Sequence, residues 1–288
     1  MTTPDIHLTT FDTSGPVGAS VDVLVGDLRV VASDRGDLVV QVRPCNPADK
    51  RDVRAAEQTT VEFTDGTLTV RGPRQPRLGV LGKVGSVDVL VELPAGSDLD
   101  AKLGAGGIGC AGPLRGCRLR TGAGDLHVEQ AETLALKTGL GTASAGTVSG
   151  EAELRSASGK LQVGSVGQSA LCKTGNGEVR IGRVAGDLHV KTANGDASID
   201  HAGASVEVNT ACGNIRVAEV VRGTATLRTA TGRIEIGIRP GTAARLDVHT
   251  RFGRVENELT TSDGPTGTDE QVEVRADTSA GDILIRRS

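Results

Sequence analysis

A short phrase recurs nine times along the chain and limits the fold more than any other feature. In each copy a threonine, or once a serine, stands three residues before a glycine. Successive glycines are 17 to 21 residues apart, and the last step is 28 residues. A fixed period of this length is typical of a solenoid, in which similar units pack one on the next. The nine glycines are Gly124, Gly141, Gly159, Gly177, Gly195, Gly213, Gly232, Gly253 and Gly281.

Apolar and polar residues alternate on both sides of each glycine, and this period of two indicates strands. Around Gly213, the alternating apolar residues are Val206 and Val208 before it and Ile215 and Val217 after it. A shorter third strand is expected about seven residues after the glycine. It would carry Val148, Val166, Val184 and Val220 in four of the repeats.

The repeat is too short for the helical crossovers of an α/β fold. The sequence therefore predicts an all-β protein. We expect a parallel β-solenoid with three-sided coils of about 18 residues. Its coils would stack at the roughly 4.8 Å spacing of paired strands.

Composition agrees with a narrow, regular core. The chain has 40 glycines and three phenylalanines, and it lacks tryptophan and tyrosine. Small and β-branched residues must therefore fill the interior. We expect the repeated threonines to point inward and their hydroxyls to bond one another from coil to coil, which offsets their burial. The glycine would take a corner conformation that a Cβ forbids.

The pattern is looser at the N-terminal end. We expect residues 1–103 to form a β-rich part that begins and caps the solenoid, and residues 104–288 to form the regular repeats, with a polar loop inserted at 257–271. Residues 43–59 would form a loop with a short helical turn, and residues 71–85 a basic, mobile loop. No boundary in the sequence demands two independent domains.

Three phrases carry a family likeness: "SVDVLVELPAGSDL" (86–99), "KTANGDASIDHAGASVEVNTACGNIRV" (191–217) and "TSAGDILIRR" (278–287). With them, the chain resembles a bacterial family of unknown function often labelled putative adhesin. The resemblance implies a right-handed β-helix and defines no catalytic residue. A more distant likeness is to bactofilins, cytoplasmic scaffolds whose short coils polymerise end to end.

The chain shows no sign of export or of a membrane span. The N-terminus has neither the basic nor the apolar region of a signal peptide, and no apolar run approaches the roughly 18–20 residues of a membrane helix. Five cysteines without a Cys-x-x-Cys motif are read as reduced thiols. We therefore expect a cytoplasmic protein.

The position four residues before the repeat glycine is basic in six of nine copies. In a solenoid these side chains would stack into a ladder on one outer face. The ladder is either a solvated surface or a site for an acidic polymer, an acidic partner or a phosphorylated surface. Nucleic acid is disfavoured, because the composition offers almost no aromatic side chain for base stacking. The six residues are Arg120, Lys137, Arg155, Lys173, Lys191 and Arg228.

The sequence gives little support for a catalytic site or a metal site. Glu178 and Asp196 fall on adjacent coils just after the glycine, where a pair of carboxylates can serve acid–base chemistry but more often caps a turn. Cys110 and Cys117 have no evident partner ligands for a metal ion. The histidines of the repeats occupy four different coil positions and do not converge. We predict no catalytic residue, no metal and no cofactor.

The sequence thus favours a non-enzymatic scaffold for protein interaction or self-association. The terminal "GDILIRRS" stops right after a strand, which suggests end-to-end association through the C-terminal coil. The alternative is a binding module that uses the basic ladder to hold an anionic polymer or acidic partner. A carbohydrate-active β-helix enzyme would need convergent carboxylates.

Overall fold

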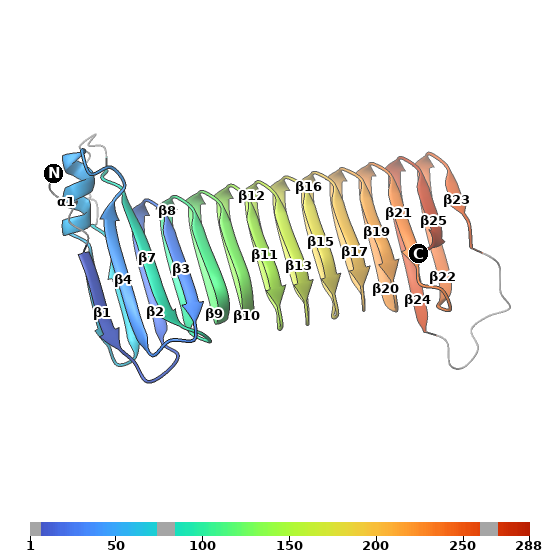
Figure 1. Ribbon diagram of the computed structural model, residues 1–288. Coiled ribbons are helices and arrows are strands. Elements are labelled where there is room, and N and C mark those ends of the chain that lie inside the picture. Colours follow the sequence, from blue (N-terminus) through green and yellow to red (C-terminus); the bar gives the residue numbers. More distant parts are fainter. Residues whose placement is uncertain (1–6, 74–83, 260–269) are drawn as a thin grey trace. The chain divides into compact units, whose positions relative to one another are not determined.

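The computed structural model describes residues 7–73, 84–259 and 270–288. Contacts between Cα atoms divide the chain into two compact units, unit 1 (Met1–Gly141) and unit 2 (Thr142–Ser288). The described part contains 25 strands and one short helix (Figure 1). The predicted all-β parallel β-solenoid is confirmed, whereas the boundary expected at residues 103/104 stays a prediction.

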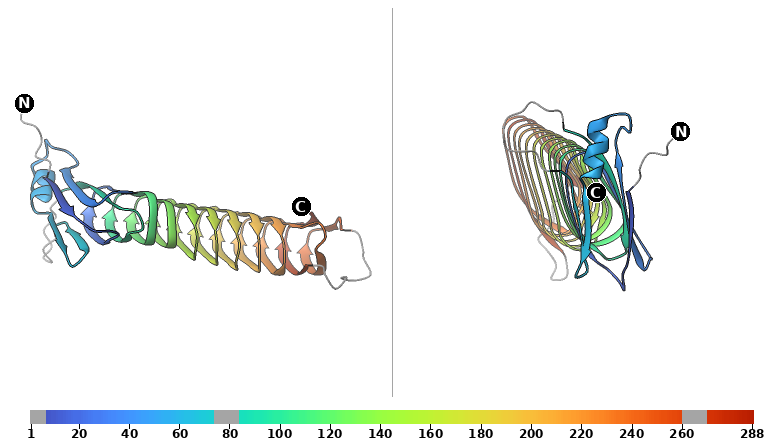
Figure 2. Two further views of the ribbon diagram at one scale, coloured as in Figure 1. Left: turned by 60° about the horizontal axis from the view of Figure 1, so that its bottom comes forward. Right: turned by 90° about the vertical axis from the view of Figure 1, so that its left-hand side faces the viewer.

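Unit 2 consists of two columns of parallel strands that enclose a core, and its coils superimpose in the end-on view (Figure 2). Column A holds the strand before each repeat glycine and column B the strand after it. Column A, in spatial order, is β12 (Ala152–Ser158), β14 (Ala170–Asn176), β16 (Leu188–Asn194), β18 (Val206–Cys212), β20 (Gly223–Thr231), β24 (Gln271–Ala280) and β22 (Ala243–Phe252). Column B is β11 (Ala143–Val148), β13 (Leu161–Val166), β15 (Val179–Val184), β17 (Ala197–Ala202), β19 (Ile215–Val220), β21 (Ile234–Ile238), β25 (Ile283–Arg287) and β23 (Val255–Asn257).

The third strand expected in each coil is continuous with the second. Val166 is the last residue of β13 and Val184 the last of β15. Pairing between these strands lapses at Gly164 and Gly182 and resumes one residue later. Val163 and Val166, the last two buried residues of β13, are therefore three residues apart. Column B thus bends at this point, which supplies the third side without a separate strand.

Each coil turns from column A to column B at the repeat glycine. Gly177 has φ +147°, and a Cβ there would lie 2.0 Å from the carbonyl oxygen of Gly159. Only glycine permits so close an approach of two backbones. The corner role predicted for glycine is confirmed.

The inward column of threonines is also confirmed, but its hydrogen bonds differ from those expected. Oγ1 of Thr174 donates to the carbonyl oxygen of Gly159 at 3.3 Å, and Oγ1 of Thr229 donates to that of Gly213 at 3.0 Å. The partner is thus the corner glycine of the coil before, and not another hydroxyl. Oγ1 of Thr192 and of Thr210 is buried without a hydrogen-bond partner.

The last coils do not follow chain order. β24 lies between β20 and β22, and β25 lies between β21 and β23. The chain therefore builds the terminal coil with β22 and β23 and then returns to fill the gap. The expectation that the C-terminal "GDILIRRS" forms a free edge is wrong, because β25 is paired on both sides.

Unit 1 has the same design, with an irregular start. Its column A strands are β6 (Thr67–Arg71), β2 (Gly18–Val25), β8 (Asp98–Ala105) and the later parts of β9 (Ile108–Ala123) and β10 (Leu126–Leu140). Column B is β7 (Val87–Pro94), β3 (Leu28–Ser33) and the earlier parts of β9 and β10. β1 (His7–Asp12), β4 (Asp37–Pro44) and β5 (Thr60–Thr64) pair antiparallel with their neighbours.

Helix α1 (Lys50–Glu57) confirms the helical turn expected in residues 43–59. Asp49 caps its N-terminus by accepting from the Arg51 amide at 2.9 Å. The buried Asp52 carboxylate accepts from the amides of Asn46 and Ser86. Most of the loops expected at 71–85 and 257–271 lies outside the described residues.

Candidate binding face

The basic ladder follows from the repeat. Each of its positions is one residue before the inward threonine or serine, and side chains alternate along a strand, so the ladder faces outward. In unit 2, Arg155 stands opposite Lys173 and Lys173 opposite Lys191. Asn209 follows Lys191, and Arg228 follows Asn209. The predicted stacking is therefore present within this unit, whereas its role in binding stays a prediction.

Acidic side chains neutralise part of the unit 2 ladder. Arg155 pairs with Glu153 on its own strand, and Nε of Arg228 lies 3.7 Å from Oδ2 of Asp277. Neither Lys173 nor Lys191 has a carboxylate oxygen within 4 Å among the described residues. These two lysines are the uncompensated part of the ladder in unit 2.

In unit 1 the ladder is longer than the repeat pattern of the sequence indicated. Arg120 stands opposite Lys137 as predicted, and Lys102 of β8 stands opposite Arg120 on the other side. Lys102 was missed because Leu103 occupies the place of the repeat threonine. A signal was present: Lys102 is four residues before Gly106, whose φ of +135° marks it as a corner glycine.

The carboxylates considered for catalysis have structural partners. Oε1 of Glu178 accepts from Nε of Arg180 at 2.6 Å, and its Oε2 lies 3.7 Å from Nζ of Lys160. Oδ1 of Asp196 accepts from the amide of Asn214 at 2.7 Å, which caps the corner of the next coil. The turn-capping interpretation fits Asp196, whereas the Glu178 carboxylate forms ion pairs with Arg180 and Lys160.

Histidines and acids pair locally and do not gather. Nδ1 of His189 lies 3.1 Å from Oε2 of Glu207, and Nδ1 of His201 lies 2.9 Å from Oε1 of Glu219. Asn209 and His189 together hold the pKa of Glu207 below its usual value. Among the described residues no group of three or more histidine, cysteine, aspartate or glutamate side chains could hold a metal ion.

The cysteines are free thiols. Cys110, Cys117 and Cys172 are buried core residues, whereas Cys45 and Cys212 are exposed. Burial raises the pKa of Cys172 to about 12. A hydrogen bond with Cys110 and burial raise the pKa of Cys117 far above its ordinary value.

Unit 1 has a hollow on its surface. The hollow has a volume of about 460 Å³ and lies where Gly109 separates Arg29 from His127 on the outside of column B.

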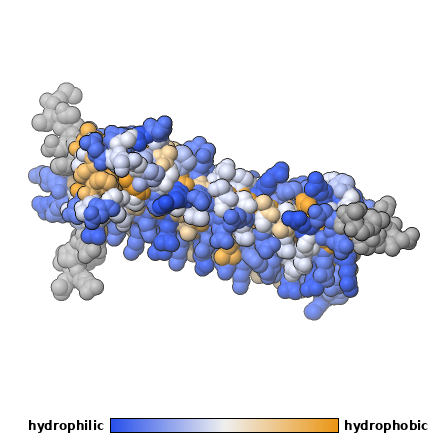
Figure 3. All heavy atoms as spheres, turned by 90° about the horizontal axis from the view of Figure 1, so that it is seen from below, coloured by the Kyte–Doolittle hydropathy of each residue, from blue (hydrophilic) through white to orange (hydrophobic). Residues whose placement is uncertain are grey.

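Figure 3 shows that hydrophobic residues gather over unit 1 on the face seen from below, while hydrophilic residues dominate along unit 2. The helix of the described part, α1, is too short and too polar to cross a membrane.

The family model described as Toastrack DUF4097 matches residues 20–286. The chain belongs to this family. The likeness to a bacterial family of unknown function, noted from the sequence, is thereby confirmed. No curated protein matches this Toastrack chain.

Several solved structures are similar to the Toastrack chain at low identity. A putative adhesin from Bacteroides fragilis NCTC 9343 is 12% identical, with 98% of each chain covered and a TM-score of 0.37. A putative adhesin from Parabacteroides merdae ATCC 43184 is 13% identical, with 80% of this chain and 95% of that chain covered and a TM-score of 0.46. A putative lipid binding protein from Parabacteroides distasonis ATCC 8503 is 11% identical, with 99% and 97% covered and a TM-score of 0.33.

Proposed function

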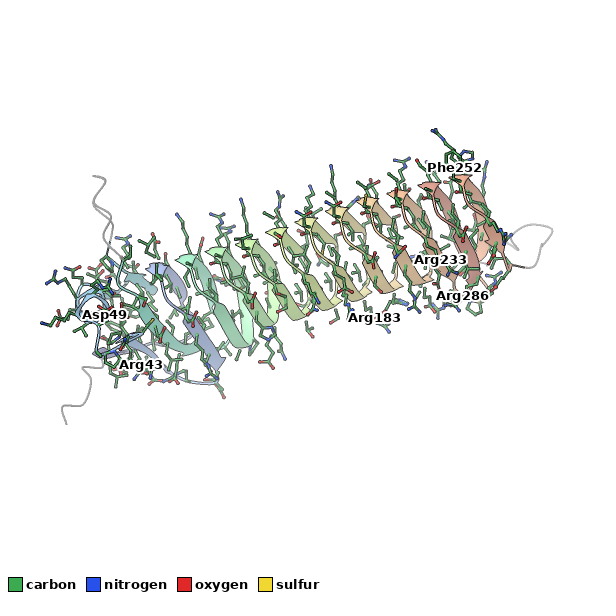
Figure 4. All side chains as sticks on the ribbon, turned by 90° about the horizontal axis from the view of Figure 1, so that it is seen from above. Arg43, Asp49, Arg183, Arg233, Phe252 and Arg286 are labelled. Atoms are coloured by element: carbon green, nitrogen blue, oxygen red, sulfur yellow. The ribbon has the colours of Figure 1, made fainter. Side chains whose placement is uncertain are left out.

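We propose that this Toastrack protein is a non-enzymatic scaffold that dimerises through the terminal coil of unit 2, formed by β22 and β23. The observation that carries the proposal is the open core of this coil. Val255 is 43% exposed, whereas Ile283, its partner one coil further in, is fully buried. Phe252, at the corner of the terminal coil, is 72% exposed and adds apolar surface at the same end (Figure 4). A second copy would bury the apolar surface that the last coil leaves in water.

The edge of the terminal coil also has unpaired backbone groups. Within the described residues β22 pairs only with β24, and β23 only with β25. A flat edge strand with apolar inward residues is a template for another strand. Leu246 and Val248 of β22 would face the core that a second copy completes, and they are half-exposed in the terminal coil.

The charges on β22 fit a second copy of the same strand. Outward positions carry Arg245, Asp247, His249 and Arg251. If two copies of β22 pair antiparallel around His249, Asp247 of each strand stands opposite Arg251 of the other. Such self-complementarity is what a two-fold, isologous interface requires.

Head-to-tail polymerisation has less support than a dimer. The outer strands of unit 1, β1 and β5, pair antiparallel with their neighbours. They do not offer the parallel coil edge that β22 and β23 present. A contact between two like coils therefore accounts for the open end better than a filament does.

The engaged carboxylates of Glu178 and Asp196 support the proposal that the chain acts without catalytic groups. The free thiols, three of them buried in the core, support a reducing compartment, and we place the scaffold in the cytoplasm.

Sedimentation velocity over a concentration series tests the dimer. We expect the unaltered chain to form dimers, and a Val248→Lys variant to stay monomeric because the lysine would place a charge in the new core. Ser279→Lys is the matched control: it adds the same charge to an exposed position of the neighbouring coil and should still dimerise. A monomeric unaltered chain at high concentration contradicts the proposal, and so does a Val248→Lys variant that dimerises normally.

A further inference from the structure

Three cationic side chains stand in register on unit 1. Lys102 lies on β8, Arg120 on β9 and Lys137 on β10, and each is opposite the next. All three are exposed. Because paired strands are about 4.8 Å apart, the charges form a line across the strands with that repeat.

This row is left uncompensated while its neighbours are neutralised. Arg118, two residues before Arg120 on the same strand, pairs with Asp100 at 3.4 Å. Neither Lys102, Arg120 nor Lys137 has a described carboxylate oxygen within 4 Å. Like charges directly opposite one another on neighbouring strands are destabilising. The row therefore lowers stability in the free protein, and an anionic ligand would remove the repulsion.

Bare backbone lies beside the cations. Two residues further along each strand, on the same face, are Gly104, Gly122 and Gly139. A Cβ on Gly122 would lie 2.4 Å from the Gly104 carbonyl oxygen, and one on Gly139 2.4 Å from that of Gly122. The close backbone approach leaves no room for side chains, so the face is flat and neutral here.

A leucine borders this flat strip. Leu24 of β2 is 36% exposed, and its Cδ1 is 3.0 Å from the place that a Cβ of Gly104 would occupy. The face therefore combines a line of positive charge with a level, partly apolar strip next to it. A matching ligand has regularly spaced anionic groups and non-aromatic rings that present an apolar C–H face.

We propose that unit 1 binds a linear acidic polysaccharide of the polyuronate class along this row. Each uronate ring bears one carboxylate, which Lys102, Arg120 or Lys137 would bind by a charge-assisted hydrogen bond. The C–H faces of the rings would lie on the glycine strip and against Leu24. This site is independent of dimerisation through unit 2.

The positions of the aromatic side chains of unit 1 argue against a single-stranded nucleic acid as the ligand. Single-stranded nucleic acids bind largely by stacking bases on aromatic rings. The rings of Phe11 and Phe63 pack against each other, with centroids 5.4 Å apart and planes tilted by 41°. They lie on β1 and β5, which are not strands of this row.

Calorimetric titration of the full chain with polygalacturonate at low salt tests the proposal. Arg120→Gln should weaken binding by about tenfold or more, and the affinity should fall with added salt. Arg118→Gln is the matched control, since it removes the same charge from the same strand two residues away. It should weaken binding by less than about twofold, as expected for an exposed, already paired charge. Circular dichroism checks that both variants keep the β fold.

Three results would overturn the proposal. Absence of polygalacturonate binding removes the ligand class. Equal weakening by Arg118→Gln and Arg120→Gln shows a response to net charge only. Tighter binding of polyphosphate or a single-stranded oligonucleotide than of polygalacturonate shows that the row serves a phosphate polymer instead.

Discussion

The hydroxyl of Thr174 donates to the carbonyl oxygen of Gly159, the corner glycine one coil back, at 3.3 Å. The same oxygen lies 2.0 Å from the place that a Cβ on Gly177 would occupy. One backbone atom thus accounts for two residue choices in the following coil. The threonine satisfies the oxygen, and the glycine leaves room for it. This contact accounts for the threonine in the repeats that make it, such as those of Thr174 and Thr229.

The threonine column separates into bonded and unbonded members, which predicts opposite responses to the same substitution. Thr174→Val should lower the free energy of unfolding by about 1 kcal/mol, because it removes a hydrogen bond. Thr192→Val should leave it unchanged or raise it, because the buried Thr192 hydroxyl has no partner. Urea unfolding of both variants, followed by circular dichroism, measures the difference. Equal losses would show that Thr192 is hydrogen-bonded in solution.

The corner glycines should not tolerate a side chain. Gly177→Ala places a methyl group against the Gly159 carbonyl and forces alanine to a φ near +147°. We expect a loss of more than about 3 kcal/mol, or failure to fold. Gly109→Ala is the control, since no atom lies within 4 Å of the added Cβ. It should change stability by less than about 0.5 kcal/mol. Similar losses in both variants would refute the corner assignment.

The uncompensated part of the unit 2 ladder should be open to improvement. Lys173→Glu replaces a lysine that stands between Arg155 and Lys191. An opposite charge at this position should raise the free energy of unfolding by roughly 0.5 kcal/mol, and salt should reduce the gain. Thermal unfolding at low and high salt measures it. A destabilised variant would mean that the lysines are compensated in solution.

The two exposed thiols should differ in their reaction with iodoacetamide. Partial desolvation of the sulfur and a hydrogen bond to the Asp88 carboxylate raise the pKa of Cys45 to about 11. Because the thiolate is the reactive form, Cys45 should react slowly near neutral pH, and its rate should rise until the pH approaches that value. Cys212 should react first. Peptide mass spectrometry over a pH series reports each rate, and faster labelling of Cys45 at neutral pH would contradict the environment described.

Most of the fold could be predicted because each repeat contains the residues that determine its own strands and its own corner. Alternation fixes which side chains face inward, and the Thr-x-x-Gly spacing fixes the corner. The partner of the threonine hydroxyl could not be predicted. Parallel register places Thr174 opposite Thr192, and only the corner geometry brings the Gly159 carbonyl closer. The merging of the last two sides of each coil depends on a bend at Gly164 that alternation alone does not show.

The order of the last coils could not be predicted either. Parallel coils that share the same alternation of apolar and polar residues can exchange places in a stack. The alternation in β24 therefore fits either side of β22. The long step from Gly253 to Gly281 was the available signal, because the added residues let the chain return past the terminal coil.

The predicted ladder is largely present in the structure. Five of its six residues stand opposite another ladder cation of their own unit, while Arg228 follows Asn209.

Hydrogen–deuterium exchange at low and high protein concentration tests the central claim, that the open coil of unit 2 is an interface. Amides of residues 243–257 should gain protection as concentration rises, because pairing with a second copy satisfies the free edge of β22 and β23. Amides of β14 and β16, which are paired on both sides, should not change and serve as the internal reference. Exchange in 243–257 that is independent of concentration in a sample shown to dimerise would contradict the account, because the interface would then lie elsewhere.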